Sequence, residues 1–468
     1  MIAPRYSSVY ENTIIRGAIY QVPPLNLAAI AGALTARGHQ VKIVDMGRRK
    51  DHELIRSIKD FSPDFAGISF TTPLAEEAFR LAELVKKIKK DVLIISGGAH
   101  STALPLSVLQ ESVIDVVFIG EGDYSVVELI GGKPATDIKG IGYKQNGEFI
   151  ISPNDEFIYN LDDLAFPAWD LFDLSEYRAN KVFARRNPAG SIETSRGCPY
   201  GCIYCNKKIF GKSFRPKSAG RVIDEMAYML RFGFGEIHVA DDCFSFDLER
   251  SKIICEEIIR KKLGLLWTLD NGIRVDKVDD ELLNLMRRSG CYRLSFGIES
   301  GDENILKLIK KGQTIEEVRR AVKMAKRAGL EVAGFFMFAL PGETSRTMQE
   351  TIDLARNLDL DIAKVAIAIP FPGTEYSEDL LRQGRITRSR WADYNIHFSA
   401  RNLYTPSVDW DTIEHYYKKF YREFYLRPSF IIKRAIKSIL NGRIIEDIRA
   451  VIASFAGYLR SGNREGSQ

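Results

Sequence analysis

Short apolar runs alternate with helical stretches along most of this 468-residue chain, and this alternation constrains its fold more than any other feature. Near the N-terminus the runs are four to six residues long, as in residues 65–70, 92–96 and 116–119. Runs this short, separated by helices, predict a parallel sheet that helices cover on both faces. We therefore expect residues 1–132 to form a doubly wound, Rossmann-like α/β domain. Its first strand is expected to be short or missing, because residues 2–5 leave little room for it.

The same alternation returns after a connecting segment. Residues 133–190 contain a hairpin signal, Asn146-Gly147 between two alternating runs, followed by a linker with proline and aromatic residues. Residues 191–400 contain six units of strand followed by helix, which predict an open, partial (β/α)6 barrel of the TIM type. Residues 401–468 predict a helical tail. Ligands of such sheets and barrels bind beyond the carboxyl ends of the strands, so the functional residues are expected there.

One loop in the second α/β region holds Cys198, Cys202 and Cys205 in the spacing C-x3-C-x2-C. Thiolates spaced in this way can face one point, and soft sulfur ligands select iron–sulfur clusters, zinc or copper(I). Three ligands leave one iron of a four-iron cluster open, whereas a structural zinc site is closed by four. A zinc knuckle would need a fourth Cys or His, and residues 193–237 hold none besides these three. The remaining cysteines are expected to be small core residues: Cys243, Cys255 and Cys291.

The cysteine spacing, with Thr194-Ser-Arg-Gly197 before it and Tyr204 ahead of the third cysteine, resembles the signature of the radical S-adenosylmethionine (SAM) enzymes. The resemblance implies a [4Fe–4S] cluster on the three cysteines, with SAM on its open iron and cleavage of SAM to a 5′-deoxyadenosyl radical. It also implies that Tyr204 packs against the adenine and that a flavodoxin- or ferredoxin-type protein donates the electron. Ala339 stands where a glycine is usual before Leu-Pro-Gly, a departure that narrows the expected adenine site.

The rest of the second region resembles the radical SAM core, and the resemblance implies further SAM contacts at strand ends. Asp241 or Asp242 stands where the family places the group that receives the SAM amine. Arg274 is expected to hold the SAM carboxylate, and Ser295 and Glu299 are expected to meet the ribose or the methionyl end. For each carboxylate the alternative is an ordinary helix N-cap or a strand-end salt bridge.

The loops at the carboxyl ends of the first sheet resemble those of the cobalamin-binding domain found ahead of many radical SAM domains. They are residues 69–72, 96–101 and 120–123, with residues 23–27 before them. The resemblance implies contacts to the nucleotide tail or the corrin from Ser69, Thr71, Thr72, Gly97, Gly98, His100 and Glu121. The alternatives are a hydrogen-bonded loop histidine and a generic doubly wound domain. The D-x-H-x-x-G motif, which brings a histidine to cobalt in other cobalamin proteins, is absent.

Composition narrows the remaining classes of protein. A hydrophobic content of 45% and a charged content of 27% are typical of a soluble globular chain, and no apolar run reaches 18 residues. Six cysteines in this length indicate a reducing cytoplasm rather than a disulfide framework. The net charge of +5 resides in residues 411–468, with 11 Lys and Arg against 6 Asp and Glu, so no nucleic-acid partner is expected. This tail predicts helices over residues 411–425, 429–440 and 444–459, which either dock on their own domain or contact an anionic membrane surface peripherally.

The whole layout resembles the branch of cobalamin-dependent radical SAM enzymes that contains the anaerobic Mg-protoporphyrin ester cyclase and the class B methyltransferases. The resemblance implies a [4Fe–4S] cluster, SAM and cobalamin as cofactors. It also implies methylation of an unactivated carbon, in which the deoxyadenosyl radical removes hydrogen and methylcobalamin supplies the methyl group. The substrate is expected to be a small, amphiphilic molecule whose identity the sequence does not give. The alternatives are a cyclisation or rearrangement without methyl transfer, and a non-enzymatic binding protein stabilised by zinc or a cluster.

Overall fold

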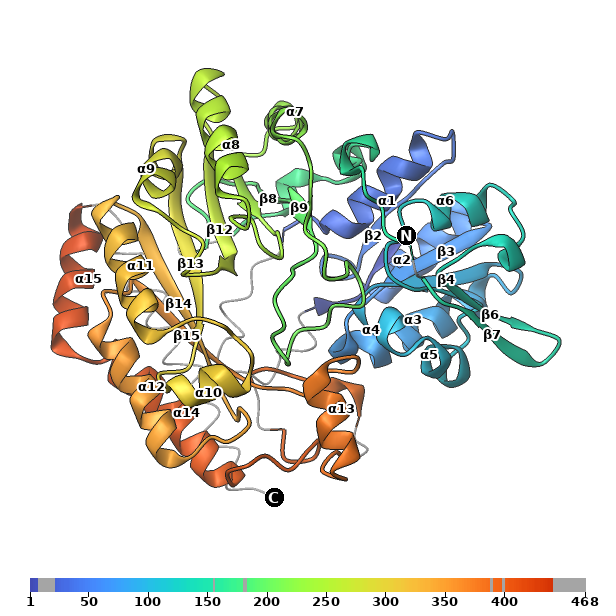
Figure 1. The fold of residues 1–468 in the computed structure, drawn as a ribbon. Helices are drawn as coiled ribbons and strands as arrows, with labels where there is room; N and C mark the ends of the chain where they lie inside the picture. The colour runs from blue at the N-terminus through green and yellow to red at the C-terminus, as the bar shows by residue number, and fades with distance from the viewer. Residues whose placement is uncertain (7–21, 155, 180–182, 388–389, 398–399, 441–468) are drawn as a thin grey trace.

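The computed structural model describes residues 1–6, 22–154, 156–179, 183–387, 390–397 and 400–440. Figure 1 shows two α/β lobes that meet along one side, the first in blue and teal and the second running from green to red. Buried apolar side chains form one large cluster in the second lobe, and separate clusters line the two faces of the first sheet. The predicted fold class, a doubly wound domain followed by a partial barrel and a helical tail, is confirmed.

The first lobe is built on a seven-stranded sheet in the order β2-β1-β3-β4-β5-β6-β7. Its strands are β1 (Ile2–Ala3), β2 (Val44–Asp45), β3 (Phe65–Ser69), β4 (Leu93–Gly97), β5 (Val116–Phe118), β6 (Ile141–Gln145) and β7 (Glu148–Ser152). The first five strands are parallel, as the alternation predicts. β1 is short, as expected, yet it pairs with both β2 and β3 and buries Ile2, so the sheet has no gap at this position.

The predicted hairpin forms the outer part of this sheet. β6 pairs antiparallel with β5 on one side and with β7 on the other. Asn146 and Gly147 adopt φ angles of 52° and 85°, the left-handed conformation that a two-residue type I′ turn requires. The hairpin therefore extends the first sheet instead of standing apart as a connector.

Helices cover both faces of the first sheet. They are α1 (Leu25–Thr35), α2 (Asp51–Phe61), α3 (Ala75–Ile88), α4 (Ala99–Ala103), α5 (Pro105–Glu111) and α6 (Ser125–Ile130). α1 is apolar on nearly all sides because it lies between the first sheet and the second lobe, where Ala28 joins the core of that lobe. At Gly32 a Cβ atom would lie 2.0 Å from the carbonyl oxygen of Phe166, so only glycine allows this close approach.

The second lobe contains a six-stranded parallel sheet in the order β15-β14-β13-β12-β11-β8. Its strands are β8 (Ala189–Ile192), β11 (Glu236–Val239), β12 (Leu266–Ile273), β13 (Cys291–Glu299), β14 (Glu331–Phe338) and β15 (Ile362–Ile367). β8 and β15 are the two ends of this sheet and are not paired with each other, so the barrel is open, as predicted.

Helices follow the strands of this barrel along the chain. They are α7 (Ala219–Arg231), α8 (Leu248–Arg260), α9 (Asp280–Arg288), α10 (Glu303–Leu308), α11 (Ile315–Arg327), α12 (Ser345–Asn357) and α13 (Glu375–Arg382). Each begins with a polar side chain that accepts a backbone N–H of the first turn, as Ser218 does for α7 and Asp247 does for α8. These N-caps fix where each strand-to-helix loop ends, and the loops carry the candidate site.

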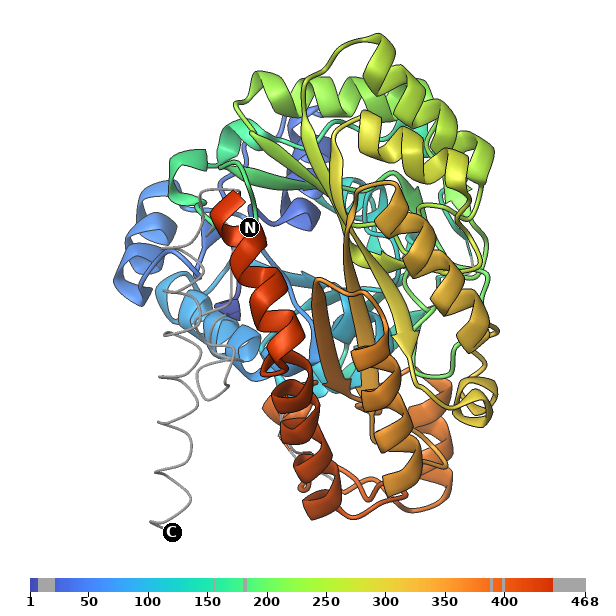
Figure 2. The same cartoon turned by 90° about the vertical axis from the view of Figure 1, so that its left-hand side faces the viewer.

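The tail helices α14 (Trp410–Tyr425) and α15 (Pro428–Leu440) run beside the open edge of the second sheet (Figure 2). The aromatic stripe of α14 docks on its own lobe, with Phe420 and Phe424 fully buried. The Tyr421 hydroxyl bonds to the backbone N–H and carbonyl of Val365 (3.4 and 3.2 Å), and the Tyr425 hydroxyl bonds likewise to Ala363 (3.1 and 2.9 Å). These hydroxyls occupy the hydrogen-bonding positions that a neighbouring strand would take along β15.

α15 differs from α14 because its apolar side chains are exposed. They are Ile431, Ile432, Ile436 and Ile439, each at least 50% exposed. The predicted helix over residues 444–459 lies outside the described residues. Among the helices that the structure describes, none combines the length and the apolar composition needed to cross a bilayer.

Candidate active site

The three predicted cysteine ligands lie on one loop that backbone contacts hold in place. The loop follows β9 (Ser195–Arg196), which pairs antiparallel with β10 (Arg215–Pro216). Gly197 turns the chain with a φ of +81°, and a Cβ atom there would lie 2.2 Å from the carbonyl oxygen of Ser213. In the middle of the loop, backbone hydrogen bonds join Ile203 to the end of α10 (3.2 Å) and to the start of α13 (3.0 Å). The loop is thus fixed to the barrel on both sides.

The thiols of the loop share one neighbourhood. Cys198 and Cys205 are partly exposed, Cys202 is buried, and all three are free. Burial acts to lower the pKa of Lys207, but the nearby thiolates of all three cysteines outweigh burial and raise it. Among the side chains that the structure describes, no three potential ligands converge closely enough to hold a metal ion. The loop therefore offers the sulfur donors that a cluster requires, but it does not hold them in a preformed metal-binding geometry.

A fourth cysteine lies against this loop. Cys243 is buried, as expected of a core residue, but its thiol also bonds to Cys198. This hydrogen bond is the main reason that the pKa of Cys198 is lowered to about 5. Reasoning from the sequence missed the contact. Its place in the sequence could have indicated the contact, because Cys243 directly follows the Asp241-Asp242 pair at the carboxyl end of β11, where site residues are expected.

Asp241 and Asp242 are adjacent in the sequence but face different surroundings. Asp241 is 3% exposed and accepts hydrogen bonds from the Thr194 N–H (2.6 Å), the Thr194 hydroxyl (2.5 Å) and the Ser195 hydroxyl (2.6 Å). Asp242 is exposed, and its carboxylate accepts the Gly197 N–H at 3.2 Å. Desolvation raises the pKa of both carboxyl groups. Asp241 thus braces the segment that leads into the cysteine loop, whereas Asp242 has room to receive an external amine.

Glu299 and Tyr204 are brought together at the end of β13. Glu299 Oε1 accepts a hydrogen bond from Lys311 Nζ at 2.7 Å, and a Cβ atom at Gly297 would lie within 2.8 Å of both groups. Burial, with Glu299 as its hydrogen-bond partner, raises the pKa of the Tyr204 hydroxyl. Glu299 adopts a φ of 68°, a conformation that is costly for a residue with a side chain and that recurs at functional sites. Its bond with Tyr204 places the Glu299 carboxylate beside the cysteine loop.

Arg274 lies nearby, and three of its five guanidinium N–H groups are already engaged. Its nitrogens donate to Asp276 (2.8 Å) and to the carbonyl oxygens of Lys311 (2.6 Å) and Gly312 (2.8 Å). The guanidinium carbon lies 3.6 Å from the ring centre of Tyr200 in the cysteine loop. Arg274 therefore joins the cysteine loop to the segment after α10, and a role in holding the SAM carboxylate would have to use its two remaining N–H groups.

Two further residues expected near SAM are buried in the barrel. Ser295 is 2% exposed in the middle of β13. Ala339, directly after β14, adopts a φ of 64°, where glycine would be unstrained. The Leu340 N–H that follows donates to Glu343 Oε2 at 3.0 Å, and burial raises the pKa of Glu343 to about 8. A buried, protonated carboxyl group thus holds the turn after β14 at neutral pH.

A cavity of about 850 Å³ lies against the first lobe, where it extends along β3 to the carboxyl ends of β3 and β4, and residues of the second lobe such as Glu193 and Arg196 also line it. Four predicted cofactor-binding residues line it, namely Ser69, Gly97, Gly98 and Glu121. The Ser69 hydroxyl accepts a hydrogen bond from the Asn26 side chain at 2.8 Å, which links β3 to α1. A Cβ atom at Gly97 would meet only Phe118, at 3.9 Å, so Gly97 offers bare backbone to the cavity. At Gly98 the φ is +93° and a Cβ atom would lie 2.8 Å from the Phe70 carbonyl oxygen.

The other three predicted residues of this lobe lie outside the cavity lining. Thr71 is exposed, and Thr72 is buried with its hydroxyl 3.2 Å from His100 Nδ1. His100 is fully buried, and its ring centre lies 4.6 Å from that of Trp391 in the second lobe. Desolvation lowers the pKa of His100 to about 4, so the ring is neutral. His100 therefore serves a contact between the lobes, which agrees with the alternative of a hydrogen-bonded histidine.

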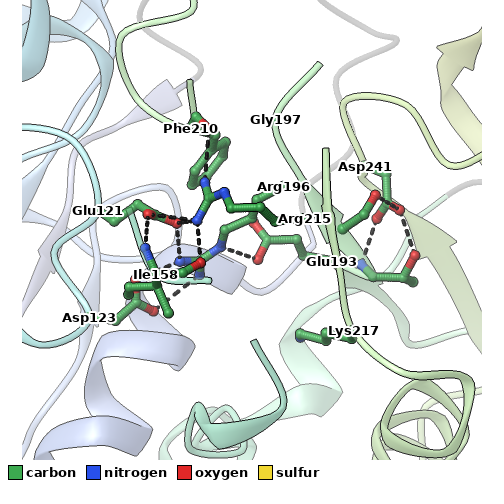
Figure 3. A network of polar contacts seen from close by, with 12 residues as sticks. Glu121, Asp123, Ile158, Glu193, Arg196, Gly197, Phe210, Arg215, Lys217 and Asp241 are labelled. Atoms are coloured by element: carbon green, nitrogen blue, oxygen red, sulfur yellow. Dashed lines mark hydrogen bonds and ion pairs between the residues drawn. The ribbon is translucent and has the colours of Figure 1, made fainter. Parts of the chain in front are cut away.

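A buried ionic network joins the cavity to the cysteine loop (Figure 3). The Arg196 guanidinium donates to Glu121 (2.8 Å), to both carboxylate oxygens of Asp123 (2.8 and 3.1 Å) and to Glu193 (2.6 Å). The Arg215 guanidinium donates to both carboxylate oxygens of Glu121 (3.0 and 2.9 Å). The side chains of Arg196, Arg215 and Glu121 are all 6% exposed or less. The carboxylate of Glu121 is therefore already occupied by two arginines.

The residues present fit the expected cofactors. The three thiols, with Lys207 beside them, are donors suited to an iron–sulfur cluster. The exposed Asp242 carboxylate beside the loop is suited to a cationic amine such as that of SAM. The cavity of the first lobe has the bare-backbone wall at Gly97 that a planar, bulky group needs for close approach.

Comparisons with known proteins agree with this arrangement. A family model described as the radical SAM superfamily matches residues 192–355, and one described as a B12 binding domain matches residues 12–130. The first match spans β11 to β14 of the barrel and includes the cysteine loop, and the second spans β2 to β5 and α1 to α6 of the first lobe.

Three curated relatives align with most of the chain. An uncharacterized methyltransferase of Pyrococcus horikoshii is 34% identical over 439 residues, which cover 89% of this chain and 93% of the relative. The cytidylyl-2-hydroxyethylphosphonate methyltransferase of Streptomyces wedmorensis is 28% identical and covers 86% of each chain. The anaerobic magnesium-protoporphyrin IX monomethyl ester cyclase of Rubrivivax gelatinosus is 27% identical and covers 87% of this chain and 75% of its own.

Solved structures share the fold. The cobalamin-dependent SAM radical enzyme OxsB, with aqua-cobalamin and SAM bound, superimposes with a TM-score of 0.73 at 17% identity, covering 97% of this chain and 71% of OxsB. The radical SAM methyltransferase TsrM of Kitasatospora setae, with cobalamin and a [4Fe–4S] cluster bound, has a TM-score of 0.69 at 19% identity, covering 86% of this chain and 88% of TsrM. At these identities the likeness concerns the arrangement of the two lobes.

Proposed function

This chain belongs to the cobalamin-binding radical SAM enzymes, and from that membership we propose that it methylates an unactivated carbon of a small molecule. Its cofactors are a [4Fe–4S] cluster, SAM and cobalamin. The observation that carries the proposal is the junction of the two sites. The loop with Glu121 lines the cavity of the first lobe and bonds to Arg196, two residues before Cys198. This junction supports the proposal, because a methyl donor bound in the cavity would lie near the loop that would hold the cluster.

When bound, the cluster and SAM supply hydrogen-atom abstraction and the corrin supplies the methyl group. The chain's own residues position these groups. Cys198, Cys202 and Cys205 would hold three irons, and Asp242 would receive the SAM amine beside them. We assign Glu299, at the end of β13, to the ribose or the methionyl group, and its neighbour Tyr204, in the cysteine loop, to the adenine. The partly open barrel leaves a small molecule access to this end of the strands.

The test is the balance of products. One methylation with external reductant consumes two SAM molecules and releases one 5′-deoxyadenosine, one methionine and one S-adenosylhomocysteine. Anaerobically reconstituted protein, supplied with candidate substrates and with SAM carrying a deuterated methyl group, should release the two adenosyl products in a 1:1 ratio and label the product. Absence of SAM cleavage in protein that contains cluster and corrin would refute the enzyme assignment.

A cyclisation or rearrangement is the second candidate, because one relative is named as an ester cyclase. Such a reaction forms 5′-deoxyadenosine without transferring a methyl group. The same assay separates the two reactions, since deoxyadenosine without S-adenosylhomocysteine and without deuterium in the product favours the cyclase.

We extend the proposal to the tail, where α15 would contact an amphiphilic substrate or an anionic membrane surface. Its exposed isoleucines and the exposed Lys433 support this idea. Because α14 is docked on the barrel, the matched truncation ends at residue 427 and removes α15 without disturbing the sheet edge. Equal co-sedimentation of the full chain and the truncated chain with phosphatidylserine vesicles would refute contact with a membrane.

A further inference from the structure

The buried network places one arginine between the two cofactor sites. Glu121 and Asp123 belong to the loop after β5, which lines the cavity of the first lobe. Arg196 ends β9 and also lines that cavity, and the chain continues from it through Gly197 to Cys198. The network therefore contacts the cavity directly and is two residues away from the first predicted cluster ligand.

We propose that Arg196 is a positioning residue that holds the corrin-binding lobe in register with the cysteine loop. The inference rests on the proposed function, because we infer that the relative position of the two lobes sets the distance between cobalt and the cluster. We assign Arg196 no contact with the cluster or with cobalt. It acts through Glu121 and Asp123 on one side and through the backbone of Gly197 on the other.

The geometry of the contact supports a role in orientation. A guanidinium is a planar fork, and Arg196 uses it for a two-pronged contact with Asp123 (2.8 and 3.1 Å) while its Nε donates to Glu193 (2.6 Å). Three carboxylates in different directions therefore fix the plane of one side chain. A lysine would keep the charge but would lose the plane, so charge and orientation can be separated by substitution.

The Arg196 contact is buried, so we expect its loss to be destabilising. The side chains of Arg196 and Glu121 are 6% and 1% exposed, so removing the guanidinium takes the ion-pair partner from Asp123 and Glu193 in a largely desolvated place. Glu121 keeps its ion pair with Arg215, at 2.9 Å. The lobes then keep a partial link, and we expect a shifted register rather than a separated protein.

A second contact joins the two lobes at a different place. Trp391, from the segment after α13, packs on His100 at 4.6 Å and donates to Glu111 at 2.9 Å. This contact involves α4 and α5, away from the Glu121 loop. The Trp391 contact, the Arg215–Glu121 pair and the packing of Ala28 all remain when the Arg196 contact is lost, so the lobes should stay together in these variants.

The first test needs no cofactor. Hydrogen–deuterium exchange is followed in two peptides, one spanning residues 116–124 and one spanning residues 195–205, in wild-type protein and in Arg196→Met, Arg196→Lys and Asp123→Asn. We expect both peptides to exchange on the order of tenfold faster in Arg196→Met, and less so in Arg196→Lys and Asp123→Asn. Arg327→Met, which removes an exposed pair with Asp280 on the outside of the barrel, is the matched control and should change neither peptide.

The second test uses protein loaded with cluster and cobalamin. The reduced cluster and cob(II)alamin are both paramagnetic, so pulsed electron paramagnetic resonance can measure the coupling between them. Wild-type protein should give one narrow distance, and Arg196→Lys should give a broader or longer one while both signals keep wild-type intensity. Asp123→Asn, which leaves Arg196 bonded to Glu121 and Glu193, covers the case in which Arg196 variants do not fold.

The outcomes separate this inference from the proposed function. A distance distribution of wild-type width in variants that hold both cofactors overturns the inference, as does faster exchange confined to residues 195–205. If wild-type protein binds no corrin or no cluster, the proposed function fails, whereas coupled exchange of the two peptides would still show that Arg196 joins the lobes.

Discussion

The two cofactor sites of this protein are built in different ways. The cysteine loop takes its three thiols from eight consecutive residues, and the backbone around Gly197 and Ile203 fixes it. The cavity of the first lobe takes its wall from the ends of several strands, from α1 and from Arg196 and Glu193 of the other lobe. The first site is local in sequence and depends on side-chain chemistry. The second is dispersed and depends on backbone shape, so the two sites should respond differently to substitution.

Loss of one thiol should separate the sites most sharply. Cys202→Ala removes one of three ligands, and we expect SAM cleavage to fall on the order of a hundredfold or more, because even outer-shell changes cost ten- to a hundredfold at metal sites. Cobalamin binding should stay unchanged. Iron and sulfide analysis, corrin absorbance and chromatography of 5′-deoxyadenosine measure the three quantities. Cys255→Ala, buried in α8, is the control. Wild-type deoxyadenosine formation by Cys202→Ala would contradict the whole assignment.

Two glycine substitutions should each impair the binding of a different cofactor. Gly98→Ala adds a Cβ atom 2.8 Å from the Phe70 carbonyl oxygen at a φ of +93°, so cobalamin affinity should fall about tenfold, given that the left-handed conformation alone costs about 1–2 kcal/mol. Gly197→Ala, whose Cβ atom would lie 2.2 Å from the Ser213 carbonyl oxygen, should instead lower cluster content.

Cobalamin titration and iron analysis of both variants check this prediction. The control is Gly201→Ala, where a Cβ atom meets nothing within 4 Å. If both variants lost the same cofactor, the sites would not be independent in the way that their construction suggests.

Two buried groups, one in each lobe, should change the free energy of unfolding with pH in opposite directions. Burial raises the pKa of Glu343 to about 8 from an ordinary 4.5, so the folded protein keeps this proton between those values while the unfolded chain releases it. The free energy of unfolding should therefore fall by about 1.4 kcal/mol per pH unit over that interval and level off above pH 8. Desolvation lowers the pKa of His100 from 6.5 to about 4, so its contribution is present above pH 6.5 and is lost as the pH falls towards 4.

Urea unfolding of Glu343→Gln and His100→Phe between pH 4 and 9 checks both slopes. The two intervals overlap between pH 4.5 and 6.5, where the opposite slopes offset each other in the wild-type protein. Glu343→Gln should therefore leave only the slope of His100, and His100→Phe should leave only that of Glu343. Curves parallel to that of the wild-type protein would show that the two groups do not titrate as their burial indicates.

The smallest expected effect lies at the sheet edge. Tyr421→Phe removes the hydroxyl that bonds to both backbone groups of Val365 and should lower the free energy of unfolding by about 1 kcal/mol, the usual worth of such a bond. Both cofactor sites should stay occupied. Thermal unfolding measures the effect, and Tyr416→Phe is the control on the same helix, where the ring packs on His415. An effect equal to that of the control would show that solvent replaces the hydroxyl at this edge.

Much of the fold follows from the sequence because it rests on local patterns. Apolar runs of strand length and polar N-caps such as Ser218 and Asp247 predict the two α/β lobes and the starts of the helices. β2 is an exception, since the alternating run over residues 40–45 is long enough for a strand but forms one only at Val44–Asp45. The reason is its position at the end of the sheet, where it pairs with a β1 of only two residues.

The candidate site was only partly visible. Cys198, Cys202 and Cys205 are identifiable from their spacing, because ligands within one loop share a short-range geometry. The bond between Cys243 and Cys198 and the pair of Glu299 with Lys311 depend on the register of neighbouring strands and loops, which no local pattern encodes. For the same reason Glu121, expected to face a cofactor, is instead held by two arginines.

The sequence by itself determined the chemistry and the class of fold: three thiols in one loop, glycine-rich strand ends, and strands alternating with helices. These features depend on residue type and on spacing along the chain, so they can be read without coordinates. The tertiary structure alone decided which of two adjacent aspartates is exposed, which cysteine supports Cys198, and that Arg196 links the lobes. Such choices depend on burial and on contacts between distant segments, as with Gly197 and Asp242 at a separation of 45 and Arg196 and Asp123 at a separation of 73. The fold selects these pairs only when the two lobes pack together.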